Sequence, residues 1–208
     1  GIIIVVSAGN AGKVNKWRIV KAPADVKSVI SVGATLESGA RAQSSSIGSE
    51  RVNFLKPDVV CFSQGGTSLS APIVTGIVAC LLEKDSTLSP AKVKEILMQS
   101  GSLSASPNNF VGYGIPDARK AASILNGQLQ KTPALQTIHA RRKTYKIKLT
   151  DSKCDKAIVY HKKDDIHVVG EDLIDADKNS FVINQVDGAM RSTVIFGDNL
   201  VEIHWRTK

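Results

Sequence analysis

The segment Gly65-Gly-Thr-Ser-Leu-Ser-Ala-Pro72 constrains the fold most, because it leads directly into a long apolar helical pattern over residues 71–82. That pattern is apolar nearly all the way round, which predicts a central helix buried on most sides. The first N–H groups of a helix have no partner within the helix itself. We therefore expect the hydroxyl of Ser68 to lie at a buried helix entrance whose free N–H groups can bind an anion.

The residues around this helix predict the sheet that it covers. Short apolar runs rich in β-branched residues alternate with helical patterns, which is typical of a parallel sheet covered by helices. The predicted strands are residues 2–6, 29–32 and 58–60, and the predicted helices are residues 68–84, 90–99 and 116–125. The first part of the chain therefore belongs to the α/β class.

After residue 126 the pattern changes to short strands with alternating apolar and polar residues. The predicted strands are residues 145–149, 157–161, 167–169, 181–184, 193–196 and 200–205. No helical pattern separates these strands, so the sequence predicts a small all-β, sandwich-like domain. We place the first domain at residues 1–127, and the linker with the second domain at residues 128–208.

Composition excludes several classes of partner for this chain of 208 residues. No apolar run approaches the roughly 20 residues that a membrane-spanning helix needs. The formal charge of +8 is spread over both domains, so we expect no nucleic-acid partner. The one local basic run, Arg141-Arg142-Lys143 followed by Lys146 and Lys148, is interpreted as a solvated linker in preference to a phosphate-binding site. Three widely spaced cysteines predict neither a disulfide framework nor a zinc site.

Two short motifs carry residues suited to acyl transfer. Ser68 at the helix entrance is the candidate nucleophile, and its own backbone N–H would bind the oxyanion that forms when the hydroxyl attacks a carbonyl carbon. Ser7-Ala-Gly-Asn10 ends an apolar strand with a small-residue turn, and the side-chain amide of Asn10 can supply a second donor. The two motifs together predict an oxyanion hole.

These motifs resemble those of the subtilisin-like serine peptidases, the subtilases. Gly66-Thr-Ser-Leu-Ser-Ala-Pro72 matches the nucleophile motif of that family, and Ser7-Ala-Gly-Asn10 matches its oxyanion motif. Three further segments follow in the family's order: Ala22-Pro-Ala24, Lys56-Pro-Asp58 and Tyr113-Gly-Ile-Pro-Asp-Ala118. The resemblance covers the chain to about residue 126 and implies part of a parallel-sheet, three-layer peptidase domain.

The resemblance also implies roles for individual residues. Ser68 would be the catalytic nucleophile and Asn10 an oxyanion donor. Ser7, Ala8 and Gly9 would form one wall of the pocket that receives the residue before the scissile bond. The substrate would be a peptide or protein, and no cofactor would be needed for the chemistry.

The resemblance also predicts the positions of two residues that follow the oxyanion motif, Lys21 and Pro23. Lys21 would lie near the base of the same substrate pocket and favour acidic side chains; the alternative is that it points to solvent, as most lysines do. By the family resemblance, Pro23 would follow a cis peptide bond.

The general base of such a peptidase is missing from the expected region. A serine hydroxyl needs a base, and in subtilases this is a histidine oriented by an aspartate, both upstream of the nucleophile. No histidine precedes His139 here. The chain also begins on an apolar strand, which a domain rarely does. We therefore expect a missing upstream segment that carries the Asp and the His, and we expect this chain alone to be inactive.

The sequence departs from the subtilase pattern before the nucleophile. Only seven residues separate Asp58 from Gly66, and Cys61-Phe-Ser63 stands where subtilases commonly have Ala-Pro-Gly. This shortening favours an alternative function, an inactive peptidase-like domain that binds peptides or docks a partner. An α/β-hydrolase is disfavoured because the serine motif is not Gly-x-Ser-x-Gly.

Two properties follow only from the family resemblance. A secreted or cell-surface location is expected, and a structural calcium ion is possible, although no site for one can be identified. The spacing of Asp175, Asp177 and Asn179 suggests a calcium loop, but Ser180 occupies the position of the required glycine and Val186 that of the required glutamate. We interpret these residues as a β-turn.

Overall fold

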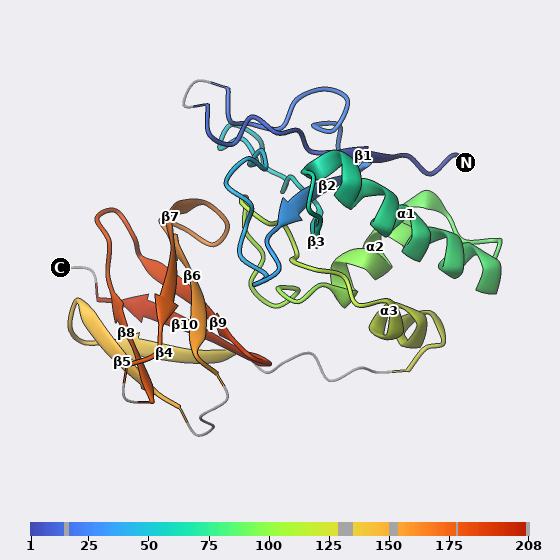
Figure 1. Cartoon of the computed structure of the whole chain (residues 1–208). Helices are drawn as coiled ribbons and strands as arrows, with labels where there is room; N and C mark the ends of the chain where they lie inside the picture. Colours follow the sequence, from blue (N-terminus) through green and yellow to red (C-terminus); the bar gives the residue numbers. More distant parts are fainter. Residues whose placement is uncertain (15–16, 129–134, 150–153, 178, 207–208) are drawn as a thin grey trace. The chain divides into compact units, whose positions relative to one another are not determined.

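The computed structural model describes residues 1–14, 17–128, 135–149, 154–177 and 179–206 (Figure 1). The chain divides into two compact units, unit 1 (Gly1–Lys131) and unit 2 (Thr132–Lys208). The boundary expected at residue 127 falls just before residues 129–134, which lie outside the described part.

Unit 1 combines a parallel sheet with helices. Its elements are β1 (Val5–Ser7), β2 (Ile30–Thr35), β3 (Val59–Phe62), α1 (Thr67–Lys84), α2 (Pro90–Ser100) and α3 (Ala118–Leu125). The strands pair in the order β1-β2-β3, with Val5 opposite Ile30 and Val32 opposite Val59. The predicted helices and strands of this part are all present, and the Ala22–Pro23 peptide bond is cis, as expected.

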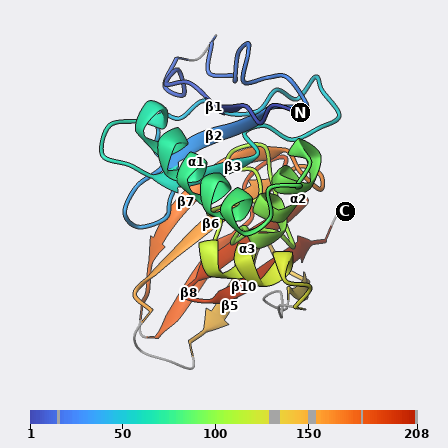
Figure 2. The same cartoon turned by 90° about the vertical axis from the view of Figure 1, so that its right-hand side faces the viewer.

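All three helices contribute to one core on a single face of this sheet. Figure 2 shows α1 running across the strands, with α2 and α3 beside it. Val74 and Val78 of α1 pack there against Val32 and Val59, together with Ile96 of α2. The opposite face is covered by loop residues such as Val20 and Ala24, and no helix of the described residues lies there.

The expectation that α1 is buried on most sides is wrong for this chain. Its inner face is buried, but Leu69 is 55% exposed and Ile73 is 47% exposed on the outer face. These two apolar side chains are therefore largely exposed within unit 1, although the sequence pattern is that of a helix enclosed on both faces.

Helix α1 also meets the length and composition criteria for a potential membrane span, with 18 residues and a mean hydropathy of 1.2. This differs from the expectation that no apolar run approaches the length of a membrane span. The same criteria are met by core helices that pack on a sheet, as the buried face of α1 does.

A buried ionic cluster ties β2, β3 and α2 together. The carboxylate of Asp58, the residue before β3, accepts hydrogen bonds from the Ser31 N–H and hydroxyl at 2.8 and 3.0 Å. The ammonium groups of Lys56 and Lys94 lie 2.7 Å from its two oxygens. Both lysines also donate to the carbonyl oxygen of Val29. Burial lowers the pKa of Lys56, and attraction to Asp58 opposes this shift.

Unit 2 is formed entirely of strands in its described residues. They are β4 (Gln136–Ala140), β5 (Thr144–Lys148), β6 (Lys156–Lys162), β7 (Val168–Asp175), β8 (Ser180–Asn184), β9 (Arg191–Phe196) and β10 (Asn199–Trp205). A five-stranded sheet has the order β4-β10-β9-β6-β7, and β5 pairs with β8 in a second sheet. Their shared core includes Val159, Phe181, Val194 and Ile203.

Two strands of unit 2 differ from the prediction. Residues 136–140 were assigned to the linker, but they form β4, which pairs in parallel with β10. Strand β7 continues to Asp175, well beyond the predicted end at residue 169. Neither strand shows a clear alternation in sequence, because both are edge strands with many exposed residues.

A polar chain crosses the core of unit 2. The Trp205 indole N–H donates to the Ser192 hydroxyl at 2.7 Å, Ser192 lies 2.8 Å from Nδ1 of His161, and Nε2 of His161 lies 3.1 Å from the Asp172 carboxylate. Burial lowers the pKa of His161, although Asp172 opposes the shift. A neutral ring that donates from Nε2 and accepts at Nδ1 satisfies every group in this chain.

We expect Asp58→Asn to destabilise unit 1 by about 3–5 kcal/mol, because it leaves two lysines in a buried site without their carboxylate. Urea unfolding followed by far-ultraviolet circular dichroism is the measurement, since all described helices lie in unit 1. Lys92→Ala is the matched control on α2, because the Lys92–Glu95 ion pair is exposed and should contribute about 1 kcal/mol or less. Equal losses in the two variants would contradict the structural role of Asp58.

Candidate active site

The Ser68 side chain is exposed at the first turn of α1. The N–H groups of Leu69 and Ser70 both bond to the carbonyl oxygen of Gly66, and the Thr67 N–H donates to Asn10. Among the described residues, no hydrogen bond involves the Ser68 N–H. The helix therefore presents one free N–H beside one exposed hydroxyl, at the positive end of its dipole.

Asn10 is fixed beside this serine by its own amide oxygen. Oδ1 of Asn10 accepts from the Thr67 N–H and from the Thr67 hydroxyl, each at 3.0 Å. A backbone N–H can only donate, so the oxygen and nitrogen of the amide are assigned without ambiguity. The NH₂ group of Asn10 is left without a partner in the described residues and is available to a ligand.

Thr67 is a site residue that the sequence reasoning missed. Besides donating to Asn10, its hydroxyl oxygen accepts from the Gly9 N–H at 3.1 Å. Thr67 therefore joins the turn after β1 to the start of α1, which lie 57 residues apart in sequence. Its position immediately before the candidate nucleophile was the available signal, because a hydroxyl there can bond across the helix entrance.

Gly66 is required by the close approach of Asn10. Its φ of 86° lies in the left-handed region. A Cβ atom at Gly66 would lie 2.8 Å from Oδ1 of Asn10. Any side chain would therefore strain the backbone and displace the amide that faces the candidate site.

Two serine hydroxyls hold the shortened connection between β3 and α1. The Ser63 hydroxyl donates to the carbonyl oxygen of Gly66 at 2.7 Å. The Ser70 hydroxyl lies 2.9 Å from the carbonyl oxygen of Cys61 and 3.0 Å from Oγ of Ser63. Because a hydroxyl has a single proton, it can donate to only one of these two oxygens at a time. These bonds give the short segment a defined conformation despite its departure from the family motif.

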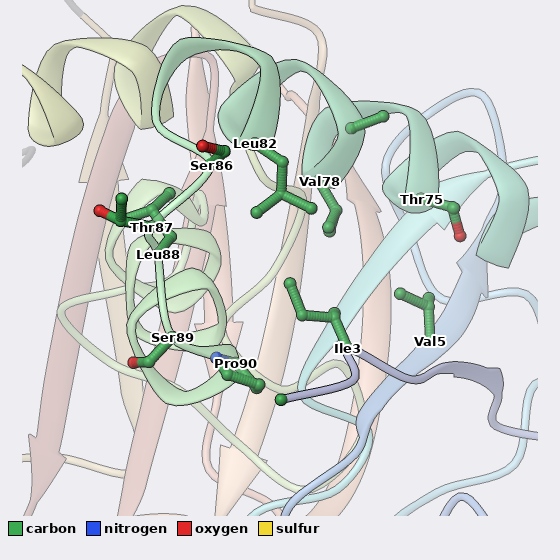
Figure 3. Close-up of a pocket in the computed structure, with 12 residues that line it drawn as sticks. Ile3, Val5, Thr75, Val78, Leu82, Ser86, Thr87, Leu88, Ser89 and Pro90 are labelled. Atoms are coloured by element: carbon green, nitrogen blue, oxygen red, sulfur yellow. The ribbon is translucent and has the colours of Figure 1, made fainter.

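Two hollows lie along the outer side of β1 and α1. The first, here called the serine hollow, has a volume of about 430 Å³ and is lined by Val5, Ser7, Ser68, Ala71, Pro72 and Thr75. The second, here called the edge groove, has a volume of about 710 Å³. Figure 3 shows Val78 and Leu82 of α1 facing Ile3 and Val5 across the edge groove. Val5 and Thr75 line both hollows, so the groove leads to Ser68.

The structure brings several of the predicted site residues together, and Lys21 lies against a tryptophan ring. Ser7 lines the serine hollow, and Gly9 bonds to Thr67. Ala8 is buried and donates its N–H to Val32 of β2. The ammonium group of Lys21 lies over the ring of Trp17, 4.9 Å from its centroid, and its side chain is exposed.

No hydrogen bond joins Ser68 to a histidine within the described residues. His161 and His167 pair with Asp172 and Asp164 of their own unit, and the ring of His139 contacts that of His204. The same described residues contain no cluster of three or more His, Cys, Asp or Glu side chains arranged to hold a metal ion.

The loop that contains Asp175, Asp177 and Asn179 forms a turn. The N–H groups of Asp177 and Ser180 each bond to the other's carbonyl oxygen, and Asn179 has a φ of 58°. A left-handed asparagine is typical of a tight turn.

Comparison with known proteins identifies the family. The model of the subtilase family, peptidase family S8, matches residues 1–114, more than half of the chain. The chain belongs to the subtilase family. Subtilisin DY of Bacillus licheniformis is 33% identical over 131 residues, which cover 59% of this chain and 47% of that protein. An extracellular basic protease of Dichelobacter nodosus is 28% identical over 173 residues, covering 70% of this chain and 28% of that protein.

The fold comparison agrees with the family assignment. The structure of the patellamide maturation protease PatA aligns with a TM-score of 0.51 at 24% identity, covering 62% of this subtilase chain and 53% of that chain. This likeness supports a subtilisin-like α/β fold for the aligned part. The chain spans less than half the length of subtilisin DY.

We expect Thr67→Val to release the Asn10 side chain, because valine keeps the shape of threonine but removes the hydroxyl that bonds to Oδ1 of Asn10 and to the Gly9 N–H. The order of the Asn10 NH₂ group, measured by NMR relaxation, should fall, and stability should decrease by about 1 kcal/mol. Thr67→Ser is the matched control, since it retains the hydroxyl. Unchanged order in Thr67→Val would show that the backbone alone positions Asn10.

Proposed function

We propose that this subtilase chain is the nucleophile-bearing part of a serine endopeptidase. The observation that carries the proposal is the pairing of an exposed Ser68, whose N–H is free, with an Asn10 amide whose oxygen is already occupied. Two donors, the Ser68 N–H and the Asn10 NH₂, are thereby left to face one oxyanion. The arrangement suits acyl transfer and needs no cofactor for the chemistry.

In the proposed reaction Oγ of Ser68 bonds to the scissile carbonyl carbon while a base accepts the hydroxyl proton. The carbonyl electron pair moves onto oxygen, where the Ser68 N–H and the Asn10 NH₂ stabilise the charge. The protonated base then gives its proton to the leaving amine as the C–N bond breaks. Water hydrolyses the resulting ester on Ser68 with the same base, which releases the acid and restores the hydroxyl.

An upstream segment carrying the Asp and the His would bind along the edge groove. Ile4 accepts from the Ile30 N–H and Ala8 donates to Val32, so the N–H and C=O groups of Val5 and Ser7, which alternate with these residues, point away from β2. Of the described strands, none lies beyond β1 in this sheet. An added strand would pair with these groups and cover the apolar groove that leads to Ser68.

Substrate and location follow from the family. The substrate would be a peptide or protein, and the whole protein would be secreted or lie at the cell surface; the D. nodosus relative is an extracellular protease. We further propose that Ser7, Ala8 and Gly9 form one wall of the pocket for the residue before the scissile bond, and that Lys21 can leave the Trp17 ring to contact an acidic side chain there.

A second function, an inactive peptidase-like domain that binds peptides, is favoured by one observation. The connection between β3 and α1 is short, and Ser63 and Ser70 hold it in a defined conformation. A stable short connection is expected if the domain has lost residues near the active site that catalysis needs but that folding does not. The two functions differ in whether Ser68 becomes nucleophilic when an upstream segment is present.

We expect a fluorophosphonate probe to label Ser68 only when an upstream segment supplies the base. The chain alone and a longer polypeptide with upstream residues would each be treated with the probe and analysed by intact mass. The longer form should gain one adduct, because an unactivated serine reacts slowly. Asn10→Leu in the longer form should lower kcat by about 10²–10³ through loss of one oxyanion donor.

Two serine variants complete the labelling experiment. Ser68→Ala should abolish the adduct, whereas Ser70→Ala should retain it, because the Ser70 hydroxyl is buried against Cys61 and Ser63. Failure to label the longer form, when it is folded by circular dichroism, would favour the inactive peptide-binding domain.

Lys21 is tested by substrate preference. In the longer form, peptides with Glu, Leu or Lys before the scissile bond should be cleaved in the order Glu, Leu, Lys, because an ammonium group attracts a carboxylate and repels another ammonium. Lys21→Met should remove the advantage of Glu while the rate for Leu stays the same. Equal rates for all three peptides in the unmodified enzyme would show that Lys21 points to solvent.

A further inference from the structure

Unit 2 contains a small pocket at one end of the parallel pair β4 and β10. Its volume is about 320 Å³, and it is lined by His139, Ala140, Arg141, His204, Trp205 and Arg206. All of these residues belong to the described part of unit 2, and none has a role in the proposed peptidase site.

The register of the two strands gathers the basic groups. His204 lies opposite His139, and Trp205 lies opposite Ala140. The strands run in parallel, so the next residues along each chain, Arg141 and Arg206, leave the sheet at the same end. The two imidazole rings are in edge contact, with centroids 5.1 Å apart. Sequence alone does not predict this grouping, because the two arginines lie 65 positions apart and residues 136–140 show no strand pattern.

The two arginines at this pocket have no carboxylate partner among the described residues. Glu202 accepts from His204 at 2.9 Å, but it also lies 2.9 Å from the ammonium group of the buried Lys162. Within the described residues, neither Arg141 nor Arg206 forms an ion pair, and both side chains are exposed. Two free guanidinium groups at one pocket repel each other, so an anion that enters between them lowers their electrostatic energy.

We propose that this pocket binds a phosphate or sulfate group. A guanidinium presents its N–H groups as a planar fork that matches two oxygens of a tetrahedral anion, and two such forks can hold one anion from two sides. The imidazole of His139 can add a donor on the pocket wall, whereas Nε2 of His204 is already bonded to Glu202. The volume exceeds that of a bare ion, so the pocket has room for part of the molecule that carries the phosphate or sulfate.

The basic run that the sequence analysis interpreted as a solvated linker is thereby divided into two parts. Arg141 lines the pocket, whereas Arg142 is equally exposed in the turn between β4 and β5 and does not line it. This difference provides a matched control, because both arginines contribute the same net charge to the same segment. Removal of either arginine weakens the long-range attraction of the protein for an anion by the same amount. Only removal of Arg141 also takes away a group that lines the pocket.

The experiment is isothermal titration calorimetry of the full chain at constant ionic strength with inorganic phosphate, inorganic sulfate and phenyl phosphate. We expect saturable binding at one site per chain. Arg141→Ala and Arg206→Ala should each raise Kd by about tenfold or more, and Arg142→Ala by less than about threefold. Arg206→Lys, which keeps the charge but loses the fork, should lie between these limits.

The outcomes separate the possible sources of the anion. Tighter binding of phenyl phosphate than of inorganic phosphate assigns the pocket to a phosphate or sulfate ester, and equal binding assigns it to the free ion. Absence of saturation, or an equal loss in Arg142→Ala and Arg141→Ala, overturns the proposal. Thermal unfolding of each variant, followed by tryptophan fluorescence in a Trp17→Phe background so that Trp205 alone is observed, confirms that the variants compared are folded.

Discussion

The buried carboxylate of Asp58 is the constraint on which the architecture of unit 1 depends. It accepts hydrogen bonds from Ser31 of β2 and ion-pairs with Lys56 before β3 and Lys94 of α2. A carboxylate taken out of water must be fully bonded, so the backbone segments that supply its donors have little freedom to move. The cluster has two lysines and one carboxylate. The remaining ammonium N–H groups therefore donate to backbone carbonyl oxygens, Lys56 to Val29 and Lys94 to Lys27.

The candidate active site is built onto this frame by a second set of polar contacts. The amide of Asn10 and the hydroxyl of Thr67 join the end of β1 to the start of α1. The end of β1 is held by its pairing with β2, and the start of α1 is held by the packing of the buried face of the helix. In the proposed peptidase, the two oxyanion donors would thus be oriented before a substrate binds, which is the condition for strong electrostatic stabilisation of a transition state.

One face of α1 and one edge of β1 are left uncovered beside the candidate active site. Helix α1 has apolar residues on both faces, but the described chain covers only one of them, and β1 keeps a free edge. A strand edge and an apolar helix face side by side favour pairing with a further segment. The position of Ser68 is therefore set within unit 1, whereas the nucleophilic role proposed for it would require a base that the described residues do not place beside it.

The sequence by itself determined the α/β class of the first part, the helices, and the pairing of Ser68 with Asn10, because caps, apolar periodicity and short motifs are local properties. It did not determine the role of Thr67, because hydrogen bonds between residues 57 positions apart depend on how strand and helix meet. It also missed β4, whose exposed edge position leaves little alternation to detect. The parallel pairing of β4 with β10, which brings Arg141 and Arg206 to one pocket, was decided only by tertiary structure. Strand register depends on packing across the whole sheet, and no local pattern encodes it.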